Sequence, residues 1–524
     1  MNEEIEEYYE ELYRLYIDEN QPLERRYRQL RESLERVVRE KIQGNSLQTT
    51  DLAARINYVA TQYGLDLKEQ NQLHTFRLTS NDILNHRKSP VKEEFLRDLR
   101  AVAYAYRKMF AQDIPLKLFS VLPKQEIASS GKKEKMEYIR RIRVCFDYAD
   151  DTYLYVHPVD VIADEPIRVV YNKPGINHEF EETIKELWRY AQLNLLDVSV
   201  DRDGIYTPSF IVLEPDYLID ISSLAECYKD YGSHPANYFL SRLVPIDNAR
   251  PLLLGNIANL FLDEWIHAGE EEPDYIDCMK KAFRQYPIEL AACAELRDPS
   301  KEKEFAKDCR MHFEHIRDVV QHTFLEPGYN LDKKEAVLEP SYICEALGIQ
   351  GRLDYMQRDM SSFIEMKSGK ADEFSMQGKV EPKENNKVQM LLYMAVLEYS
   401  MGQDRRRMHP YLLYTRYPLL YPARASWAQV RRVINLRNRI VAAEYGVQFH
   451  NHPDFTRNLL AQINPEVVNE RKLSGRFWEQ YLKPSISRFR EKLSALEPLE
   501  QAYFYTLYNL SLIHISEPTR QEAI

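Results

Sequence analysis

The chain has 524 residues, 44% of them hydrophobic, so it is long enough for several domains with sizeable cores. Its formal net charge of −11 argues against a surface that is basic throughout, so nucleic-acid binding would depend on local basic patches. Residues 1–20 carry eight acidic residues and one arginine, which excludes a secretory signal. No apolar run reaches transmembrane length, and we expect no membrane partner.

The first 210 residues divide into a helical region and a region of strands. Charged and apolar residues recur at helical spacing over residues 3–41 and 51–109, with breaks at Asn45-Ser46 and Pro90. They predict a helical N-terminal domain over residues 1–115.

A β-rich module is expected next, over residues 116–210. Alternating side chains in residues 138–144 and 153–156 predict two strands, with a break at residues 147–151. The sequence leaves open whether this module holds nucleic acid or is a structural spacer.

The second half of the chain alternates between helices and short strands. Residues 252–267 have helical periodicity, and a second helix is expected over residues 386–400. Short strands are expected at residues 336–339, 350–356, 362–367 and 410–417. The predicted order is helix, three strands, helix, strand, within a mixed α/β (α+β) chain.

Two of these strands carry charges that suit a metal site. Asp354 lies on the first, and Glu365 and Lys367 lie on one face of the next because side chains alternate along a strand. Mg²⁺ prefers hard oxygen ligands, so two carboxylates on neighbouring strands can bind it. The flanking residues are apolar, and buried charges need partners or a metal. The triple taken alone also fits a solvated hairpin.

A second pair of residues lies on the helix over residues 386–400. Gln389 and Tyr393 are four residues apart and share a face. They could face the charged strands, or Tyr393 could simply pack in the core with Leu392 and Val396.

Taken together, these segments resemble the PD-(D/E)xK nuclease superfamily in its RecB-like branch. The closest resemblance is to the nuclease half of flap-processing replication helicase-nucleases, and the CRISPR adaptation nucleases are similar too. The pattern covers residues 212–417. It consists of residues 213–220 with Ser222, Ser223 and Cys227, the helix of Gly255, the strand of Glu339, residues 347–354, residues 365–370, and Gln389 to Tyr393.

The resemblance implies an αβββαβ nuclease core within residues 211–420. It also implies that Asp354, Glu365 and the backbone carbonyl of Met366 bind Mg²⁺ or Mn²⁺. Lys367 would orient the attacking water, and Gln389 and Tyr393 would hold the DNA backbone. The implied reaction is hydrolysis of single-stranded or flap DNA in replication or repair.

One position departs from the family pattern on the Gly255 helix. The family commonly has a histidine where this chain has Asn259, whose amide is a weaker ligand. Asn259, Asp263 or His267 could supply the ligand instead. The alternative is a catalytically weakened nuclease-fold module that binds DNA or acts as a scaffold.

Many members of this branch also bind an iron-sulfur cluster through four cysteines. Cys227 occupies the first of these positions, but no cysteine follows Cys344 and no pair is spaced Cys-x-x-Cys. We therefore expect no cluster. Scattered cysteines suit a reducing, cytoplasmic location.

Basic residues that could contact DNA cluster in two places, and solvated helix faces explain them equally well. The clusters are Arg405 to Arg407 and a helix with Arg424, Arg431, Arg432, Arg437 and Arg439.

The C-terminal part is expected to be a helical connector over residues 421–509. Residues 510–520 are similar to the translation of a transposase-type sequencing adapter, so we interpret residues 510–524 as a non-native tail. In the family resembled, a helicase domain follows, and we expect it as the partner in the missing part of the same chain.

Overall fold

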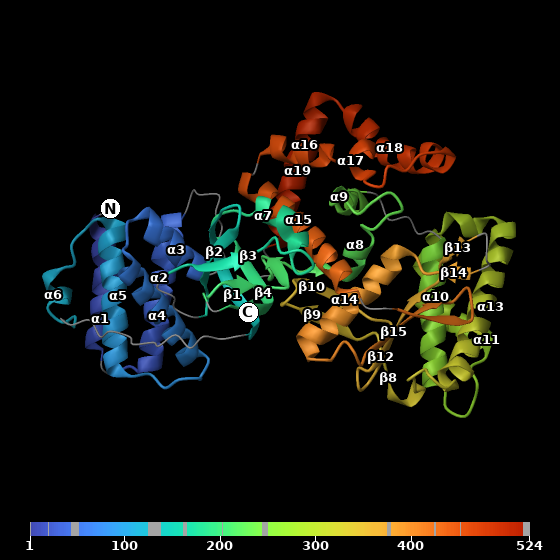
Figure 1. Cartoon of the computed structure of the whole chain (residues 1–524), viewed down its shortest axis with the longest axis horizontal. Helices are drawn as coiled ribbons and strands as arrows, with labels where there is room; N and C mark the ends of the chain where they lie inside the picture. The colour runs from blue at the N-terminus through green and yellow to red at the C-terminus, as the bar shows by residue number, and fades with distance from the viewer. Residues whose placement is uncertain are drawn as a thin grey trace. The chain divides into compact units, whose positions relative to one another are not determined.

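The computed structural model describes residues 2–18, 20–42, 52–123, 138–160, 165–201, 203–243, 250–374, 379–423, 426–450 and 452–516. The chain is mixed α/β, as expected, and contains several small sheets. It divides into two compact units (Figure 1), Met1–Glu214 with Glu444–Asn451, and Pro215–Ala443 with His452–Ile524. Among the described residues, no helix has the length and apolar character needed to cross a membrane.

The first unit begins with a helical bundle. Its helices are α1 (Asn2–Ile17), α2 (Leu23–Ile42), α3 (Leu52–Gln62), α4 (Leu67–Leu84), α5 (Lys92–Phe110) and the short α6 (Leu116–Phe119). The helical run predicted over residues 3–41 is interrupted between α1 and α2, next to Pro22, which cannot donate a backbone hydrogen bond. The predicted break at Asn45-Ser46 lies outside the described residues.

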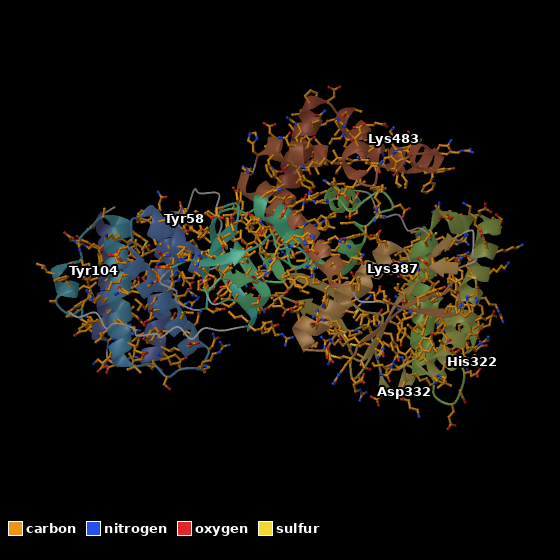
Figure 2. The ribbon with its side chains drawn as sticks, in the orientation of Figure 1. Tyr58, Tyr104, His322, Asp332, Lys387 and Lys483 are labelled. Carbon is orange, nitrogen blue, oxygen red and sulfur yellow. The ribbon has the colours of Figure 1, made fainter. Side chains whose placement is uncertain are left out.

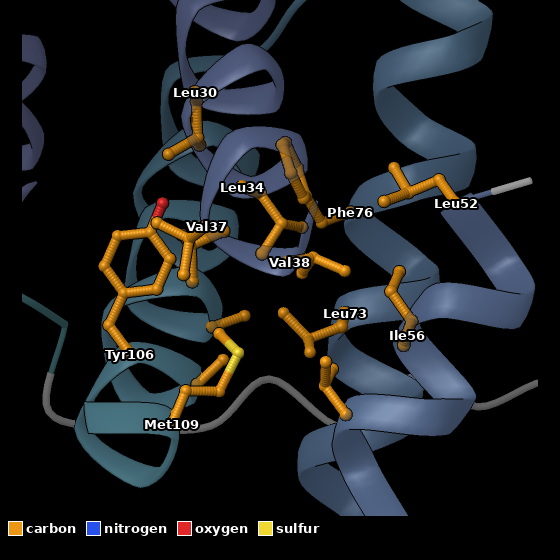
Figure 3. Close-up of a cluster of buried hydrophobic side chains, with 14 of the residues drawn as sticks. Leu30, Leu34, Val37, Val38, Leu52, Ile56, Leu73, Phe76, Tyr106 and Met109 are labelled. Atoms are coloured by element: carbon orange, nitrogen blue, oxygen red, sulfur yellow. The ribbon is translucent and has the colours of Figure 1, made fainter. Parts of the chain in front are cut away.

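Apolar stripes from α2, α3, α4 and α5 meet in the centre of this bundle. Figure 3 shows Leu34 and Val38 of α2 facing Leu73 and Phe76 of α4, and all four are fully buried. Each helix buries one face because its apolar residues recur every three to four positions. The hydroxyls of Ser33 and Tyr106 lie 3.0 Å apart and satisfy each other inside the core.

A closed barrel of strands follows the bundle. Its strands are β1 (Tyr138–Ala149), β2 (Tyr153–Pro158), β3 (Ile167–Val170), β4 (Gln192–Val200), β5 (Tyr206–Thr207) and β6 (Phe210–Leu213). β1 pairs with β2, β2 with β3, β3 with β5, β5 with β4, and β4 returns to β1. β6 continues along the edge of β4 after Pro208. The turn η1 (His178–Phe180) and helix α7 (Glu181–Lys185) connect β3 to β4.

The break predicted at residues 147–151 is partly wrong. β1 continues through Asp147 to Ala149, with an irregularity in its pairing to β2 between Phe146 and Tyr148. The turn itself is short, because the Asp150 carboxylate accepts hydrogen bonds from the backbone N–H groups of Thr152 and Tyr153. Tyr58 of α3, labelled in Figure 2, lies edge-on to Tyr190 with ring centroids 6.0 Å apart, so the bundle packs against the barrel.

The second unit is built on a five-stranded sheet in the order β16, β15, β12, β11, β8. Its strands are β8 (Ala336–Leu338), β11 (Tyr355–Gln357), β12 (Ser362–Lys367), β15 (His409–Tyr414) and β16 (Leu419–Pro422). β12 and β15 are parallel and the other neighbours are antiparallel. A parallel pair requires a crossover, which helix α14 (Glu384–Met401) provides.

Two long helices bury one face of this sheet. Phe261 and Trp265 of α10 (Arg250–His267) and Phe313 of α13 (Pro299–Gln321) share a core with Ile364 and Met366 of β12. The alternate residues of β12, including Glu365, therefore point toward the opposite face. Figure 2 labels Lys387 on α14, the helix from which Gln389 hydrogen-bonds Glu365.

A three-stranded sheet corrects the prediction of one strand over residues 350–356. β10 (Ile349–Arg352) pairs with β7 (Ile219–Asp220) and β9 (Ser341–Cys344), whereas β11 belongs to the five-stranded sheet. The chain passes between the sheets at Leu353 and Asp354. Leu353 donates its N–H to Pro340 and Asp354 accepts from the N–H of Glu339, both through backbone atoms. Asp354 is thus held between two sheets.

The remaining elements surround these sheets. They are helices α8 (Ile221–Ala225), α9 (Ala236–Leu243), α11 (Tyr275–Gln285), α12 (Pro287–Ala292), α15 (Trp427–His450), α16 (Pro453–Ala461), α17 (Pro465–Val468), α18 (Lys483–Ser494) and α19 (Pro498–Ser516), a π-helical turn (Trp478–Leu482), 3-10 turns (Ala294–Arg297, Thr323–Leu325 and Lys333–Glu335), and the hairpin β13 (Asp372–Phe374) and β14 (Lys379–Glu381). The strand predicted over residues 410–417 ends at Tyr414.

Candidate functional site

The structure brings Asp354 and Glu365 to adjacent positions. Asp354 Oδ2 accepts a hydrogen bond of 2.6 Å from the backbone N–H of Met366, the residue after Glu365. This bond lies just beyond the last paired residues of β11 and β12, so the side chain of Asp354 extends the contact between the strands. The carboxylate is therefore fixed beside Glu365 by main-chain geometry.

Glu365 is buried, with 3% of its surface exposed, and its two oxygens differ in their contacts. Oε1 accepts hydrogen bonds from Lys367 Nζ at 2.8 Å and from Gln389 Nε2 at 2.7 Å. Oε2 is buried and has no hydrogen-bond partner. A buried carboxylate oxygen without a partner is costly, so this atom is suited to accept a proton or a cation.

The electrostatics agree with this reading. Burial, and then the charge of Asp354, raise the pKa of Glu365 to about 8 despite the nearby lysine. Burial also raises the pKa of Asp354. Burial lowers the pKa of Lys367, but the Glu365 carboxylate more than offsets this, so the net shift is upward. Two carboxyl groups and one ammonium therefore share this site. When both carboxyl groups are ionised, the site has a net negative charge that favours a further cation.

Gln389 and Tyr393 of α14 both reach this region but make different contacts. Gln389 is buried and holds Glu365 directly. Tyr393 is also buried and donates its hydroxyl to the backbone carbonyl of Arg352, two residues before Asp354. A side chain at Gly351 would meet that hydroxyl at 3.1 Å. The Tyr393 hydroxyl is therefore engaged by the last residue of β10, two residues before Asp354.

Helix α10 contributes Asp263 and Asn259 one turn apart. Burial, and then the charge of Glu339, raise the pKa of Asp263 to about 6, and Asp354 adds to the shift. Asp263 is thus within electrostatic reach of Glu339 and Asp354. No polar contact of Asn259 with the site is seen among the described residues. His267 is exposed, and its Nδ1 lies 2.8 Å from the Asp263 carbonyl oxygen of its own helix.

Two acidic residues near the site were not singled out from the sequence as site residues. Glu339 has a φ of 48°, which is unusual for a residue other than glycine, and its carboxylate pairs with Arg352 at 3.2 Å. Glu226, the residue directly after α8, accepts hydrogen bonds from Asn385 at 3.1 Å and from Lys229 at 3.0 Å. Burial would raise the pKa of Glu226, but Lys229 lowers it overall, with a smaller effect from Lys367. Glu226 carries no local sequence signal, and Glu339 entered the sequence pattern only through its strand. Both approach the site through long-range packing.

The predicted basic surface on α15 is mostly wrong. Arg437 is fully buried and Arg431 is 9% exposed, whereas Arg432 is exposed and Arg424 lies outside the described residues. Arg437 donates to the backbone carbonyls of Gly348 and Tyr217. It therefore holds the segments that form β7 and β10, and a buried guanidinium with such partners is structural.

The other candidate cluster, Arg405 to Arg407, is more accessible. Arg406 and Arg407 are exposed, and Arg405 lies over the ring of Trp427 at 4.8 Å from its centroid. Arg439 is half-buried.

Within the part of the chain that is described, no group of three or more His, Cys, Asp or Glu side chains is arranged to hold a metal ion. All six cysteines are buried and free, and Cys227 donates its Sγ–H to the Ser223 carbonyl at 3.3 Å. Burial raises the pKa of the Cys227 thiol to about 12.

Comparison with known proteins adds no assignment to this geometry. No protein-family model matches the chain, and a search of curated proteins found no match.

Proposed function

We propose that this chain is a Mg²⁺- or Mn²⁺-dependent nuclease that hydrolyses phosphodiester bonds of single-stranded or flap DNA. The observation that carries the proposal is the split environment of Glu365. One oxygen is fixed by Lys367 and Gln389, and the other is buried beside Asp354 without a partner. The large majority of buried side-chain polar atoms in proteins have a hydrogen-bond partner, so the unpartnered oxygen needs an explanation.

The order of elements around the site supports a restriction-endonuclease-like core. Helix α10, strands β8, β11 and β12, helix α14 and strand β15 occur in the αβββαβ order, and β12 is parallel to β15. Helices α11 to α13 are inserted before β8, strands β9 and β10 before β11, and the hairpin of β13 and β14 before α14. This is the arrangement expected for a RecB-like PD-(D/E)xK domain.

The donor set fits a hard divalent cation. Asp354, Glu365 and the backbone carbonyl of Met366 offer oxygen ligands, and Mg²⁺ is often bound through only one or two carboxylates plus water. When bound, such an ion would lower the pKa of a water molecule and neutralise phosphate charge. Asp263 of α10, unlike Asn259, lies within electrostatic reach of Asp354, but it does not complete a group of three metal-binding side chains among the described residues.

The protein side chains have separate roles in this proposal. Gln389 orients Glu365 so that Oε2 faces away from the Lys367 contact. Lys367 places an ammonium beside the carboxylates, where it stabilises negative charge developing on the phosphate. Tyr393 is a positioning residue that holds the Arg352 carbonyl and with it the strand leading to Asp354.

A second candidate is a nuclease-fold module that binds DNA without cutting it. Asn259 in place of the usual histidine favours it, as does the lack of a group of three metal-binding side chains in the described ranges. The unpartnered Glu365 oxygen, beside an intact lysine, favours the enzyme.

Cleavage of labelled single-stranded and flapped DNA with Mn²⁺ distinguishes the two. The wild-type chain should cut, and Glu365→Ala and Lys367→Ala should not. Equal cleavage by all three proteins, or binding without cleavage by the wild type, would overturn the proposal.

A further inference from the structure

A group of aromatic side chains lies on the outer surface of the barrel in the first unit. We call it the tyrosine strip, and it consists of Tyr148 on β1, Tyr153 and Tyr155 on β2, and Arg168 on β3. Tyr148 and Tyr155 are stacked, with ring centroids 4.3 Å apart and planes inclined by 12°. Tyr153 lies edge-on to Tyr155 at 6.5 Å, and the Arg168 guanidinium lies 5.7 Å from the Tyr153 centroid.

Strand register explains why these side chains share one face. Tyr155 is paired with Tyr148 on one side and with Arg168 on the other. Their neighbours Leu154 and Val156 are fully buried, so the alternation of β2 turns its tyrosines outward. Tyr148 is 50% exposed although it is stacked on Tyr155, so part of its ring remains accessible.

The place of the strip in the barrel points to the class of ligand. The ring of strands β1, β2, β3, β5 and β4 forms a five-stranded barrel with a short helical connection between β3 and β4. This is the arrangement of the OB-fold, which binds oligonucleotides on the face of its second and third strands, between the loop after strand 1 and the loop after strand 4. Here Asp150 of the first loop accepts from the Tyr155 hydroxyl, and the Asp203 carbonyl of the second accepts from Arg168.

We propose that the tyrosine strip binds single-stranded nucleic acid by stacking bases on the outer face of Tyr148 and on Tyr153. Tyr155 supports Tyr148 from behind, and Arg168 supplies a cation for a neighbouring phosphate. Base stacking on aromatic rings suits any base sequence, because every base has a flat π-face. This proposal does not depend on the nuclease site, which belongs to the other unit.

The charges around the strip predict how the binding responds to salt. The nearby carboxylates of Asp150 and Asp201 are engaged in their own turns, where each accepts two backbone N–H groups. Arg168 is the cation of the strip, so few counterions are released on binding. The slope of log affinity against log salt should therefore be shallow, about −0.7 for each phosphate neutralised on a single strand.

The test measures binding of the full chain in EDTA, so that cleavage does not interfere. Fluorescein-labelled oligo(dT) and oligo(U) of about 15 nucleotides cover the site size of one such barrel, and anisotropy gives the affinities. Tyr148→Ala should weaken binding by about tenfold or more, because it removes the ring on which a base stacks. Tyr148→Phe keeps the ring and should bind within about threefold of the wild type. The two oligonucleotides show whether the strip prefers DNA or RNA.

A matched control is available on the same strand. Tyr138 of β1 is 58% exposed, similar to Tyr148, but lies outside the strip with its hydroxyl on Asp197. Tyr138→Ala should leave the affinity unchanged. Circular dichroism melting of each variant identifies any that fails to fold. If Tyr148→Ala does not fold, the affinities of Tyr155→Phe and Tyr155→Leu are compared instead, because Tyr155 supports Tyr148 by stacking.

The proposal would be overturned by absence of binding by the wild type at about 100 μM protein, by equal loss of affinity in Tyr138→Ala and Tyr148→Ala, or by unchanged binding in Tyr148→Ala. Binding by a proline-rich peptide instead of either oligonucleotide would also overturn it. Cleavage by the wild type and by Tyr148→Ala is measured separately with Mn²⁺, so failure of the nuclease proposal appears as absent cleavage, whereas failure of the strip appears as unchanged binding in Tyr148→Ala.

Discussion

Two buried carboxylates, one in each unit, show how a structural site differs from a candidate reactive site. Asp98 in the helical bundle is 1% exposed, and both of its oxygens are satisfied, Oδ2 by the Tyr27 hydroxyl at 3.2 Å and Oδ1 by Arg97. Glu365 is 3% exposed, but one of its oxygens has no partner. The two carboxylates are buried to a similar degree, so they differ in hydrogen bonding: Glu365 has an oxygen without a partner.

The two pKa values follow the same distinction. Burial raises the pKa of Asp98 to about 6, and Arg97 opposes the shift. Burial raises the pKa of Glu365 to about 8, because the charge of Asp354 adds to it and outweighs the help from Lys367. A carboxyl that stays protonated near neutral pH, with an oxygen facing a second carboxyl, is adapted to exchange its proton for a cation.

The largest expected effect comes from neutralising each carboxylate in turn. Glu365→Gln should lower cleavage by about 10³-fold or more, because it removes a charged ligand of the metal. Asp98→Asn should leave cleavage of the folded protein within about threefold while lowering stability by about 1–3 kcal/mol. Single-turnover cleavage and thermal melting measure the two quantities. Comparable loss of cleavage in both variants would remove the distinction between the sites.

Substitution of Lys367 should have the next largest effect on cleavage, and it tests the role proposed for the ammonium group. Lys367→Met keeps much of the side-chain volume and should reduce cleavage by about 10²-fold, because the ammonium no longer stabilises the phosphate. Since Lys367 lowers the pKa of Glu365, the pH profile of the residual activity should also shift upward. A variant that loses activity without moving its pH profile would indicate that Lys367 is only structural.

The pH dependence of stability separates the two carboxylates without any assay of activity. Both pKa values are raised on folding, so each group contributes stability that is complete below its unfolded pKa and lost as the pH rises through its folded pKa. For Asp98 the loss is over by about pH 6, and for Glu365 it continues to about pH 8. In EDTA, the decline in Tm between about pH 6 and pH 8 should therefore become smaller in Glu365→Gln but not in Asp98→Asn.

Added Mg²⁺ should reverse this trend in the wild type. The ion binds the ionised carboxyl and competes with the proton, so its stabilising effect should grow between about pH 6 and pH 8. Glu365→Gln should show no such growth. An equal Mg²⁺ response at both pH values would mean that Glu365 does not bind the ion.

The sequence predicted those parts of the site that depend on local periodicity. The strand expected over residues 362–367 has those bounds, and the period of two places Lys367 on the same side as Glu365, where the two form an ion pair. The helix expected over residues 386–400 lies within α14, and its period brings Gln389 to Glu365.

Features that depend on distant segments could not be predicted. The chain changes sheets at Leu353 without a glycine or proline there, because Pro340 and the strand at Ile219 set the pairing. From the sequence, Arg437 is expected on the surface. In the fold it is buried and donates hydrogen bonds to the carbonyls of Tyr217 and Gly348. Spacing along the chain carries no information about such contacts.

The smallest expected effect concerns the hydroxyl of Tyr393. Tyr393→Phe leaves the Arg352 carbonyl without its donor and should cost about 0.5–1.5 kcal/mol of stability. Because Tyr393 contacts the strand and not the carboxylates, cleavage should fall less than in Gln389→Ala, which releases Glu365 Oε1 from α14. Melting and single-turnover rates of the two variants check this order. A larger loss of cleavage in Tyr393→Phe, with DNA affinity reduced in parallel, would instead place the hydroxyl on the nucleic-acid backbone, the role that the family resemblance implies.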